Sequence, residues 1–216
     1  MADAATDRLP LRERKKLRTR KALIDTALEL FTARGFDNTT LDELCDTVEV
    51  SKRTFFRNFT SKEDVAMAPL QDLWAVFLTE IADREPATGS LLQALQDALL
   101  AALDRVSTAD WADRAARSHL LAAATPAMAA HNLQFCDRTI GDALTILTER
   151  YDLDPGTDQR PRLALDILVA AFHRALDTWS TRPGTSTLAA ELDAAFTAVP
   201  QALTMTPNPR SPANPR

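Results

Sequence analysis

Glycine is scarce in this chain. Only five of its 216 residues are glycine. Four of them, Gly35, Gly89, Gly156 and Gly184, lie in apparent breaks between apolar-periodic segments, so Gly141 alone falls inside a helical pattern. Alanine and leucine dominate, and runs of β-branched residues are few. Because alanine and leucine are strong helix formers and glycine interrupts helices, the composition predicts an all-α fold.

Cysteine and long apolar runs are also scarce. The two cysteines, Cys45 and Cys136, are far apart and lie in apolar-periodic segments, which favours two buried thiols in a reducing compartment over a disulfide or a metal site. No apolar run approaches about 18 residues, the length typical of a membrane-spanning helix. No charged-then-apolar leader opens the chain. We therefore expect a soluble, cytoplasmic protein with no membrane partner, no metal and no other cofactor.

Lysine is absent after residue 62, and this absence reveals a charge asymmetry. Residues 1–65 carry 13 Lys and Arg against 12 Asp and Glu, a balance of +1, whereas residues 66–216 carry 12 against 18, a balance of −6. Residues 8–21 contain eight basic side chains and a single acid, Glu13. This asymmetry predicts a polyanionic partner for the N-terminal end only.

The N-terminal quarter has the pattern of three helices. Apolar residues recur at three- and four-residue steps from about residue 11 to 34, and Gly35 then supplies a left-handed C-terminal cap, with Phe36 placed to pack back on the helix. Thr40 opens a second, short helix with a T-x-x-E capping box, and Ser51 caps a third. Two short helices joined by a tight turn behind a longer one are the helix-turn-helix pattern.

The third helix carries aromatic and basic residues on separate faces. In the stretch VSKRTFFRNF, Phe55 and Phe59 are four residues apart and share one face, so we expect them to anchor the helix on the first two. The side chains left facing outward are then Lys52, Arg53, Phe56 and Arg57. Such a basic amphipathic face suits duplex DNA, a membrane surface or plain solvent.

Helix follows helix over the rest of the chain, which brings the expected total to about nine. Pro69 falls inside the fourth, where it should kink or restart the helix; a hinge and a harmless irregularity are the two interpretations. We expect a mobile arm at residues 1–10 and a disordered Pro-rich tail at residues 204–216. The predicted starts and ranges after the third helix are a cap at Ser61, a cap at Ser90, a cap at Asp110, residues 126–151, residues 161–181 and residues 185–203.

The stretch ALELFTARGFDNTTLDELCDTVEVSKRTFFRNFTSKEDV resembles the tetracycline-repressor (TetR/AcrR) family of bacterial transcriptional regulators. The combination of R-G-F, T-T, V-S, T-F-F and F-x-S-K-E carries the resemblance, over about a quarter of the chain. It implies a three-helix, helix-turn-helix DNA-binding domain at residues 11–60 and a helical ligand-binding and dimerisation domain at residues 61–203. The implied function is a ligand-responsive regulator. Repression is the usual mode in this family, and activation is the alternative.

The resemblance also implies that the third helix enters the major groove of DNA. Lys52 and Arg53 are the candidates for reading bases, because both can donate to guanine O6 and N7. Lys62, at the start of the fourth helix, is expected to seat a phosphate. The predicted DNA-binding set is Thr40, Ser51, Lys52, Arg53, Thr54, Phe56, Arg57, Asn58, Lys62, Arg14, Lys15 and Arg18.

A homodimer on a palindromic operator is the expected arrangement, because a helix-turn-helix protein usually pairs two heads about one DNA turn apart. The eighth helix is apolar on more than one side, and such a helix must be covered on more than one side. We therefore expect the eighth and ninth helices to form the dimer interface. The predicted interface residues are Leu165, Leu168, Phe172, Leu176, Trp179, Leu188, Leu192 and Phe196.

The fourth to eighth helices are expected to enclose a pocket for an apolar or amphipathic small-molecule effector. The predicted lining residues, each of which ordinary core packing would also explain, are Trp74, Phe77, Trp111, Met128, His131, Phe135 and Phe172. His119, His131 and His173 are further candidates to orient a ligand, with a purely structural role as the alternative. No spacing of metal-ligand type links these histidines to the cysteines.

Two other function classes stay open. An adaptor or membrane-surface protein would also carry a basic N-terminus, but the apolar stripe of the first helix is matched by apolar faces on the next two, as a small core requires. An all-helical enzyme is the other alternative, although no nucleophile motif, phosphate loop, paired carboxylates or metal motif stands out.

Overall fold

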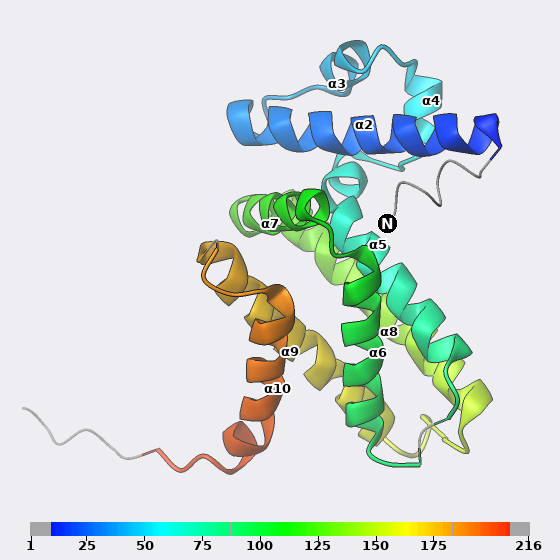
Figure 1. The fold of residues 1–216 in the computed structure, drawn as a ribbon, viewed down its shortest axis with the longest axis vertical. Coiled ribbons are helices and arrows are strands. Elements are labelled where there is room, and N and C mark those ends of the chain that lie inside the picture. Colours follow the sequence, from blue (N-terminus) through cyan, green and yellow to red (C-terminus); the bar gives the residue numbers. More distant parts are fainter. Residues whose placement is uncertain (1–9, 87, 183, 208–216) are drawn as a thin grey trace, which may run out of the picture.

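The computed structural model describes residues 10–86, 88–182 and 184–207, and within these ranges all regular structure is helical. Figure 1 shows α3 and α4 on one side of the long helix α2 and the remaining helices on the other side. Residues 1–9 of the predicted arm (1–10) and residues 208–216 of the predicted tail (204–216) lie outside the described residues, and Thr204, predicted to start the tail, is the last residue of α10. The helices are α2 (Leu11–Arg34), α3 (Leu41–Thr47), α4 (Lys52–Phe56), α5 (Lys62–Asp83), α6 (Leu91–Val106), α7 (Ala109–Ala124), α8 (Pro126–Arg150), α9 (Arg160–Thr181) and α10 (Leu188–Thr204). The predicted all-α class, with about nine helices, is confirmed.

Capping residues set most of the helix starts. In the box before α3, Thr40 Oγ1 accepts from the Glu43 N–H at 3.2 Å and the Thr40 N–H donates to Glu43 Oε2 at 2.8 Å. Ser51, Ser61 and Ser90 each accept from the backbone N–H three residues on. Because such a bond satisfies a donor that the first helical turn leaves free, the sequence positions of these residues predict where the helices start.

Two helix starts differ from the predicted ones for the same physical reason. Thr108, rather than Asp110, caps α7, and Thr187 caps α10, which therefore begins at Leu188 instead of near Thr185. Both threonine side chains accept from the N–H three residues on. Because Thr108 serves as the cap, the Asp110 carboxylate can bond to groups outside its own helix.

The end of α2 follows the predicted glycine cap. Gly35 has φ +89°, a conformation that side-chain-bearing residues rarely adopt, and its N–H donates to the Phe31 carbonyl at 3.0 Å. The chain then turns so that the Phe36 ring packs edge-on against the Phe31 ring, with 4.9 Å between centroids. This packing directs the following segment toward α3.

Helix α5 is the central element that joins the N-terminal helices to the rest. It packs against α2 at its start and against α6, α7 and α8 along its length. It is long and apolar enough by composition to cross a membrane, but 61% of that stretch is buried inside the structure, as expected for the core helix of a globular fold. Of the two outcomes predicted at Pro69, a kink or a restart, the restart is wrong, because α5 runs as one helix from Lys62 to Asp83. Pro69 itself is buried, and its carbonyl accepts from Trp111 Nε1 at 3.0 Å.

Candidate nucleic-acid interface and small-molecule cleft

The short helix α4 is held from behind by its aromatic face. Phe55 is fully buried and Phe59 is 3% exposed, and their ring centroids lie 5.8 Å apart. Leu44 of α3 and Phe31 of α2 belong to the same buried cluster. Five helical residues cannot hold a fixed direction by themselves, so this packing gives α4 its orientation.

The other face of α4 is open to solvent. Phe56 is 55% exposed, although its ring makes an edge-to-face contact with the Phe55 ring, with 5.4 Å between the centroids. Lys52, Arg53 and Arg57 are exposed as well. Phe56 is the one phenyl ring among the exposed large apolar side chains of the described residues. The outward basic and aromatic face that the sequence predicts is therefore present, on the side of α2 away from α5 to α10 (Figure 1).

Lys52 has a partner in the adjoining helix. Its ammonium lies 2.7 Å from Asp42 of α3, and both side chains are exposed. The hydrogen bond that Lys52 donates to Asp42 raises the pKa of Lys52, so the side chain stays charged. A DNA-bound Lys52 would have to exchange this carboxylate for a base or a phosphate, whereas Arg53 has no such competitor among the ion pairs of the described residues.

Several polar side chains that were predicted to contact DNA form hydrogen bonds with neighbouring residues of the chain. The Thr40 hydroxyl bonds Glu43, and the hydroxyls of Ser51 and Thr54 lie 3.0 Å apart. Asn58 Nδ2 donates to the Thr54 carbonyl at 2.8 Å and so closes the end of α4. These side chains fix the ends of α3 and α4, and the Thr40 hydroxyl, which donates its single hydrogen to Glu43, has none left to donate to a phosphate.

Lys62 requires a correction. Its ammonium donates to the carbonyls of Phe36 at 2.9 Å and Thr39 at 2.7 Å, and it lies 4.5 Å from the centre of the Phe36 ring. The side chain is half-buried. Lys62 therefore satisfies the loop after α2 from inside the protein, and the expected phosphate seat at this residue is replaced by a structural role.

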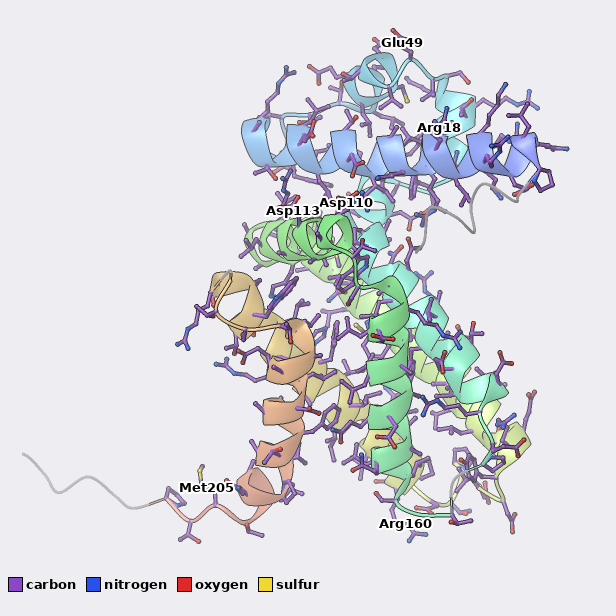
Figure 2. The ribbon with its side chains drawn as sticks, in the orientation of Figure 1. Arg18, Glu49, Asp110, Asp113, Arg160 and Met205 are labelled. Carbon is purple, nitrogen blue, oxygen red and sulfur yellow. The ribbon has the colours of Figure 1, made fainter. Side chains whose placement is uncertain are left out.

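Helix α2 contributes a basic cleft beside α4. The cleft has a volume of about 460 Å³. Of the three α2 residues predicted to contact DNA, Lys15 lines it, Arg18 is exposed and labelled in Figure 2, and Arg14 is half-buried. Lys16 and Thr19 were missed, although their spacing from Arg12 places them on one helical face. The lining residues are Arg12, Glu13, Lys15, Lys16, Thr19, Thr54, Arg57 and Asn58.

A second cleft, of about 360 Å³, lies between α5, α7, α8 and α9. Trp74, Phe135 and Phe172 line it as predicted. The other predicted residues do not: Phe77 and Met128 are fully buried, Trp111 is bonded to Pro69, and His131 bonds the side chain of Gln71, which lines the cleft instead. Phe77, Trp111 and Met128 are large and apolar and lie in the core, and sequence alone does not separate core from cleft. The lining residues are Met67, Leu70, Gln71, Trp74, His119, Ala122, Ala123, Ala129, Asn132, Leu133, Phe135, Phe172, His173, Leu176 and Asp177.

The polar end of this cleft is built from two histidines and a carboxylate. His119 Nε2 lies 2.8 Å from Asp177 Oδ1, and His173 Nε2 lies 4.0 Å from the Cys136 thiol. Burial, assisted by the nearby His119, lowers the pKa of His173, and burial raises the pKa of Cys136. His173 and Cys136 are therefore neutral at pH 7. No lysine or arginine lines the described cleft, so it offers little to a strongly anionic ligand.

The predicted dimer residues require a second correction. Leu165, Leu168, Phe172, Leu176, Leu188, Leu192 and Phe196 are at most 7% exposed within the single chain, and Trp179 is half-buried. Their stripes pack α9 and α10 against each other and α9 against α6 and α8. These side chains are the core of one protomer, so a dimer through α9 and α10 would have to use the opposite faces of both helices.

Neither cysteine belongs to a disulfide or a metal cluster in the described residues. Cys45 is buried and Cys136 half-buried, and both are free thiols. No group of three or more potential metal ligands occurs in the described part of the chain.

Comparisons with known proteins agree with this geometry. Residues 23–68 match the family model described as bacterial regulatory proteins of the tetR family, and residues 89–204 match a model described as the MftR C-terminal domain. The HTH-type transcriptional regulator TcmR of Streptomyces glaucescens is 36% identical over 179 residues, which cover 81% of this chain and 79% of TcmR. The putative mycofactocin biosynthesis transcriptional regulator MftR of Mycobacterium tuberculosis is 30% identical over 99 residues, 45% of this chain and 46% of MftR. A transcriptional regulator from Aquifex aeolicus VF5 superimposes with a TM-score of 0.52 at 12% identity, covering 85% of this chain and 99% of that one.

Proposed function

Because the chain belongs to the TetR family of bacterial transcriptional regulators, we propose that it binds a palindromic operator as a homodimer, represses transcription there and is released by a small apolar or amphipathic molecule. The family and its named relatives are regulators rather than enzymes. The protein acts in the cytoplasm, where the chromosome lies. Residues 11–60 form the DNA-binding domain and residues 61–203 the ligand-binding and dimerisation domain.

The observation that carries the proposal is the exposed face of α4. The major groove of B-DNA is about 12 Å wide and admits one helix, and α4 presents Arg53, Phe56 and Arg57 on an orientation fixed by Phe55. Arg53 is the base reader of this set, because a guanidinium can donate twice to guanine O6 and N7. Phe56 offers an apolar contact to a thymine methyl group, and Lys52 joins the interface after releasing Asp42.

Affinity without sequence preference comes from the basic cleft of α2. Arg12, Lys15 and Lys16 line it together with Arg57 of α4, so a DNA backbone that follows α4 would pass these cations. Each neutralised phosphate releases counterions and steepens the salt dependence of binding. These contacts set the register of the head on the duplex and leave sequence reading to α4.

The homodimer forms through the outward faces of α9 and α10. On α9 this face carries Leu163, which is 52% exposed, and, two turns further along the same face, the exposed Ala170. On α10 it carries the exposed small residues Ala190 and Ala194, which allow another helix to approach closely. Two copies of the pair α9 and α10 then make a four-helix interface with two-fold symmetry, and a two-fold dimer requires a near-palindromic operator.

The effector binds in the cleft between α5, α7, α8 and α9. Its volume of about 360 Å³ lies within the range of small-molecule sites, and its lining is apolar apart from a few convergent polar groups. Trp74 and Phe172, whose ring centroids lie 5.1 Å apart, form the apolar wall. The neutral His173 and the His119–Asp177 pair form the polar end. A largely apolar molecule with one or two hydrogen-bonding groups fits this arrangement.

The test is selection of bound fragments from a random DNA library, followed by fluorescence anisotropy on the selected operator. We expect a palindrome with two half-sites. Arg53→Ala should lose the preference at one position of each half-site, at a cost of about 1–3 kcal/mol. Arg117→Ala, which removes an arginine paired with Asp113 on its own helix, is the control and should keep the preference. Recovery of fragments without a shared motif, or equal binding to anionic lipid vesicles, would refute the proposal.

A further inference from the structure

The contact between α2 and α7 is made by four alternating charges. Lys21 and Asp25 of α2 are four residues apart, and so are Asp110 and Arg114 of α7. The Lys21 ammonium lies 3.0 Å from Asp110, and Arg114 reaches both Asp110 at 3.5 Å and Asp25, to which its Nε donates. Figure 2 places Asp110 at the junction directly below α2. Arg114 contacts both carboxylates of this cluster, one on each helix, and its side chain is 19% exposed.

The second contact of α2 with the body lies on α5. Arg20 makes two bonds to Asp72, at 3.0 and 2.9 Å, and its guanidinium lies 4.9 Å from the centre of the Phe59 ring. Lys62 ties the start of α5 to the loop after α2. The three N-terminal helices are thus attached to the body at α5, and the charged contact of α2 with α7 is a second attachment beside it.

The edge of the contact between α2 and α7 that carries these charges is open to solvent, since the side chains of Lys21 and Asp110 are both more than half exposed. A cleft of about 350 Å³ runs along it, and its lining is mostly charged. The hydrogen bond from Lys21 holds the pKa of Asp110 below its usual value, so the carboxylate stays ionised at neutral pH. Exposed ion pairs add little to folding stability, about 0–1 kcal/mol each, yet their geometry is directional. The cluster is therefore suited to fixing an angle rather than to stabilising the fold.

We propose that Arg114 is a positioning residue that fixes the angle between the DNA-binding helices and the body of each protomer, and thereby the half-site spacing that the dimer accepts. The proposal rests on the proposed function, because spacing has meaning only for a dimer on two half-sites. Arg114 touches no DNA in this arrangement and acts through Asp25 of α2.

The physics of the duplex makes spacing a sensitive measure of this angle. One inserted base pair moves a half-site by about 3.4 Å and turns it by about 35° around the helix axis. A head held at one angle cannot follow both changes, so a rigid dimer discriminates sharply between neighbouring spacings. A head that pivots on α5 alone can follow them in part, and the discrimination falls.

The experiment measures dissociation constants for the selected operator and for versions with one base pair inserted or removed at its centre. The wild-type chain should bind the selected spacing at least about tenfold more tightly than either neighbour. Arg114→Ala should reduce this ratio to about threefold or less, a loss of roughly 0.7 kcal/mol. Arg114→Lys, which keeps the charge without the planar fork, should give an intermediate ratio. Arg138→Ala, which removes an exposed arginine of α8 outside this cluster, is the control and should keep the wild-type ratio.

The ratio is informative because misfolded protein lowers all the affinities alike and leaves their ratio unchanged. Should Arg114→Ala fail to fold, Asp25→Asn, which removes the charge of the α2 carboxylate that Arg114 contacts, tests the same proposal with a loss in the same direction. A wild-type ratio in Arg114→Ala, or in Asp25→Asn where that replaces it, overturns the proposal, as does a wild-type chain that accepts all spacings equally. A wild-type chain that binds no two-half-site DNA refutes the proposed function instead.

Discussion

The N-terminal helices and the pair α9 and α10 place their large apolar side chains differently. On α4 two adjacent phenyl rings are divided between core and solvent, because Phe55 is fully buried while Phe56 is 55% exposed. On α9 and α10 most large apolar side chains are buried inside the chain, and Leu163, 52% exposed, is the large apolar side chain on the proposed dimer face of α9. Each proposed binding surface thus carries a half-exposed apolar side chain on a helix whose apolar stripe is buried in its own protomer. The difference shows that apolar periodicity identifies a buried face but not whether a protein core or a partner covers it.

The strongest way to sharpen this contrast is to truncate the two adjacent phenyl rings separately. Phe55→Ala should lower the free energy of unfolding by about 3–5 kcal/mol, because it leaves a cavity behind α4. Phe56→Ala should change it by less than about 0.5 kcal/mol and should weaken operator binding instead. Urea unfolding and fluorescence anisotropy measure the two effects. Equal destabilisation by both substitutions would show that Phe56 is a core residue.

The equivalent comparison on the other side of the molecule sets Leu192 against Leu163. Leu192 is fully buried, so Leu192→Ala should lower the free energy of unfolding by about 2–5 kcal/mol. Leu163→Ala should spare the fold and raise the dissociation constant of the dimer about tenfold, since each copy loses apolar contact worth roughly 0.8 kcal/mol per methylene. Urea unfolding at fixed protein concentration and sedimentation equilibrium give the two values. An unchanged dimer in Leu163→Ala would place the interface elsewhere.

Two lysines near the DNA-binding helices provide the next comparison, because the structure assigns them different roles. Lys62→Met keeps the aliphatic stem but leaves the carbonyls of Phe36 and Thr39 without their donor, which should cost about 1–3 kcal/mol of folding stability. Lys15→Met, on the basic cleft, should leave stability unchanged and reduce the slope of log K against log salt by about 0.9. A flatter salt slope in a fully stable Lys62→Met would restore the phosphate seat expected from the sequence.

The sequence predicted the features that depend on neighbours along the chain. Thr40, Ser51, Ser61 and Gly35 mark helix ends through bonds that span three or four residues, and each was placed correctly. The inward Phe55 and outward Phe56 followed from the same short range, since the helical period fixes which side chains share a face.

The features that depend on tertiary contacts were missed. Lys62 finds its carbonyls 23 and 26 residues away, and Arg114 finds Asp25 at a separation of 89 residues. No local pattern distinguishes such a lysine from one that faces a phosphate. The core role of Leu165 and Leu192 was missed because a helix with two apolar sides does not reveal which side faces its own chain.

The smallest expected effect concerns the polar end of the cleft, which differs from the DNA-binding face in holding a half-buried, neutral base, His173. Burial lowers the pKa of His173 below its ordinary value of 6.5, and the groups that face it are His119, Asp177 and Cys136. In the unfolded chain the same imidazole titrates normally and binds more protons near pH 6. The free energy of unfolding should therefore be unaffected by this group above pH 6.5 and should fall as the pH decreases below it.

His173→Gln should flatten that decline in urea titrations between pH 5 and 7.5, while His131→Gln, which removes the ring bonded to Gln71, serves as the control. A decline that steepens in His173→Gln would mean that the folded protein favours the charged ring, and the cleft would then suit an anionic effector rather than a neutral one.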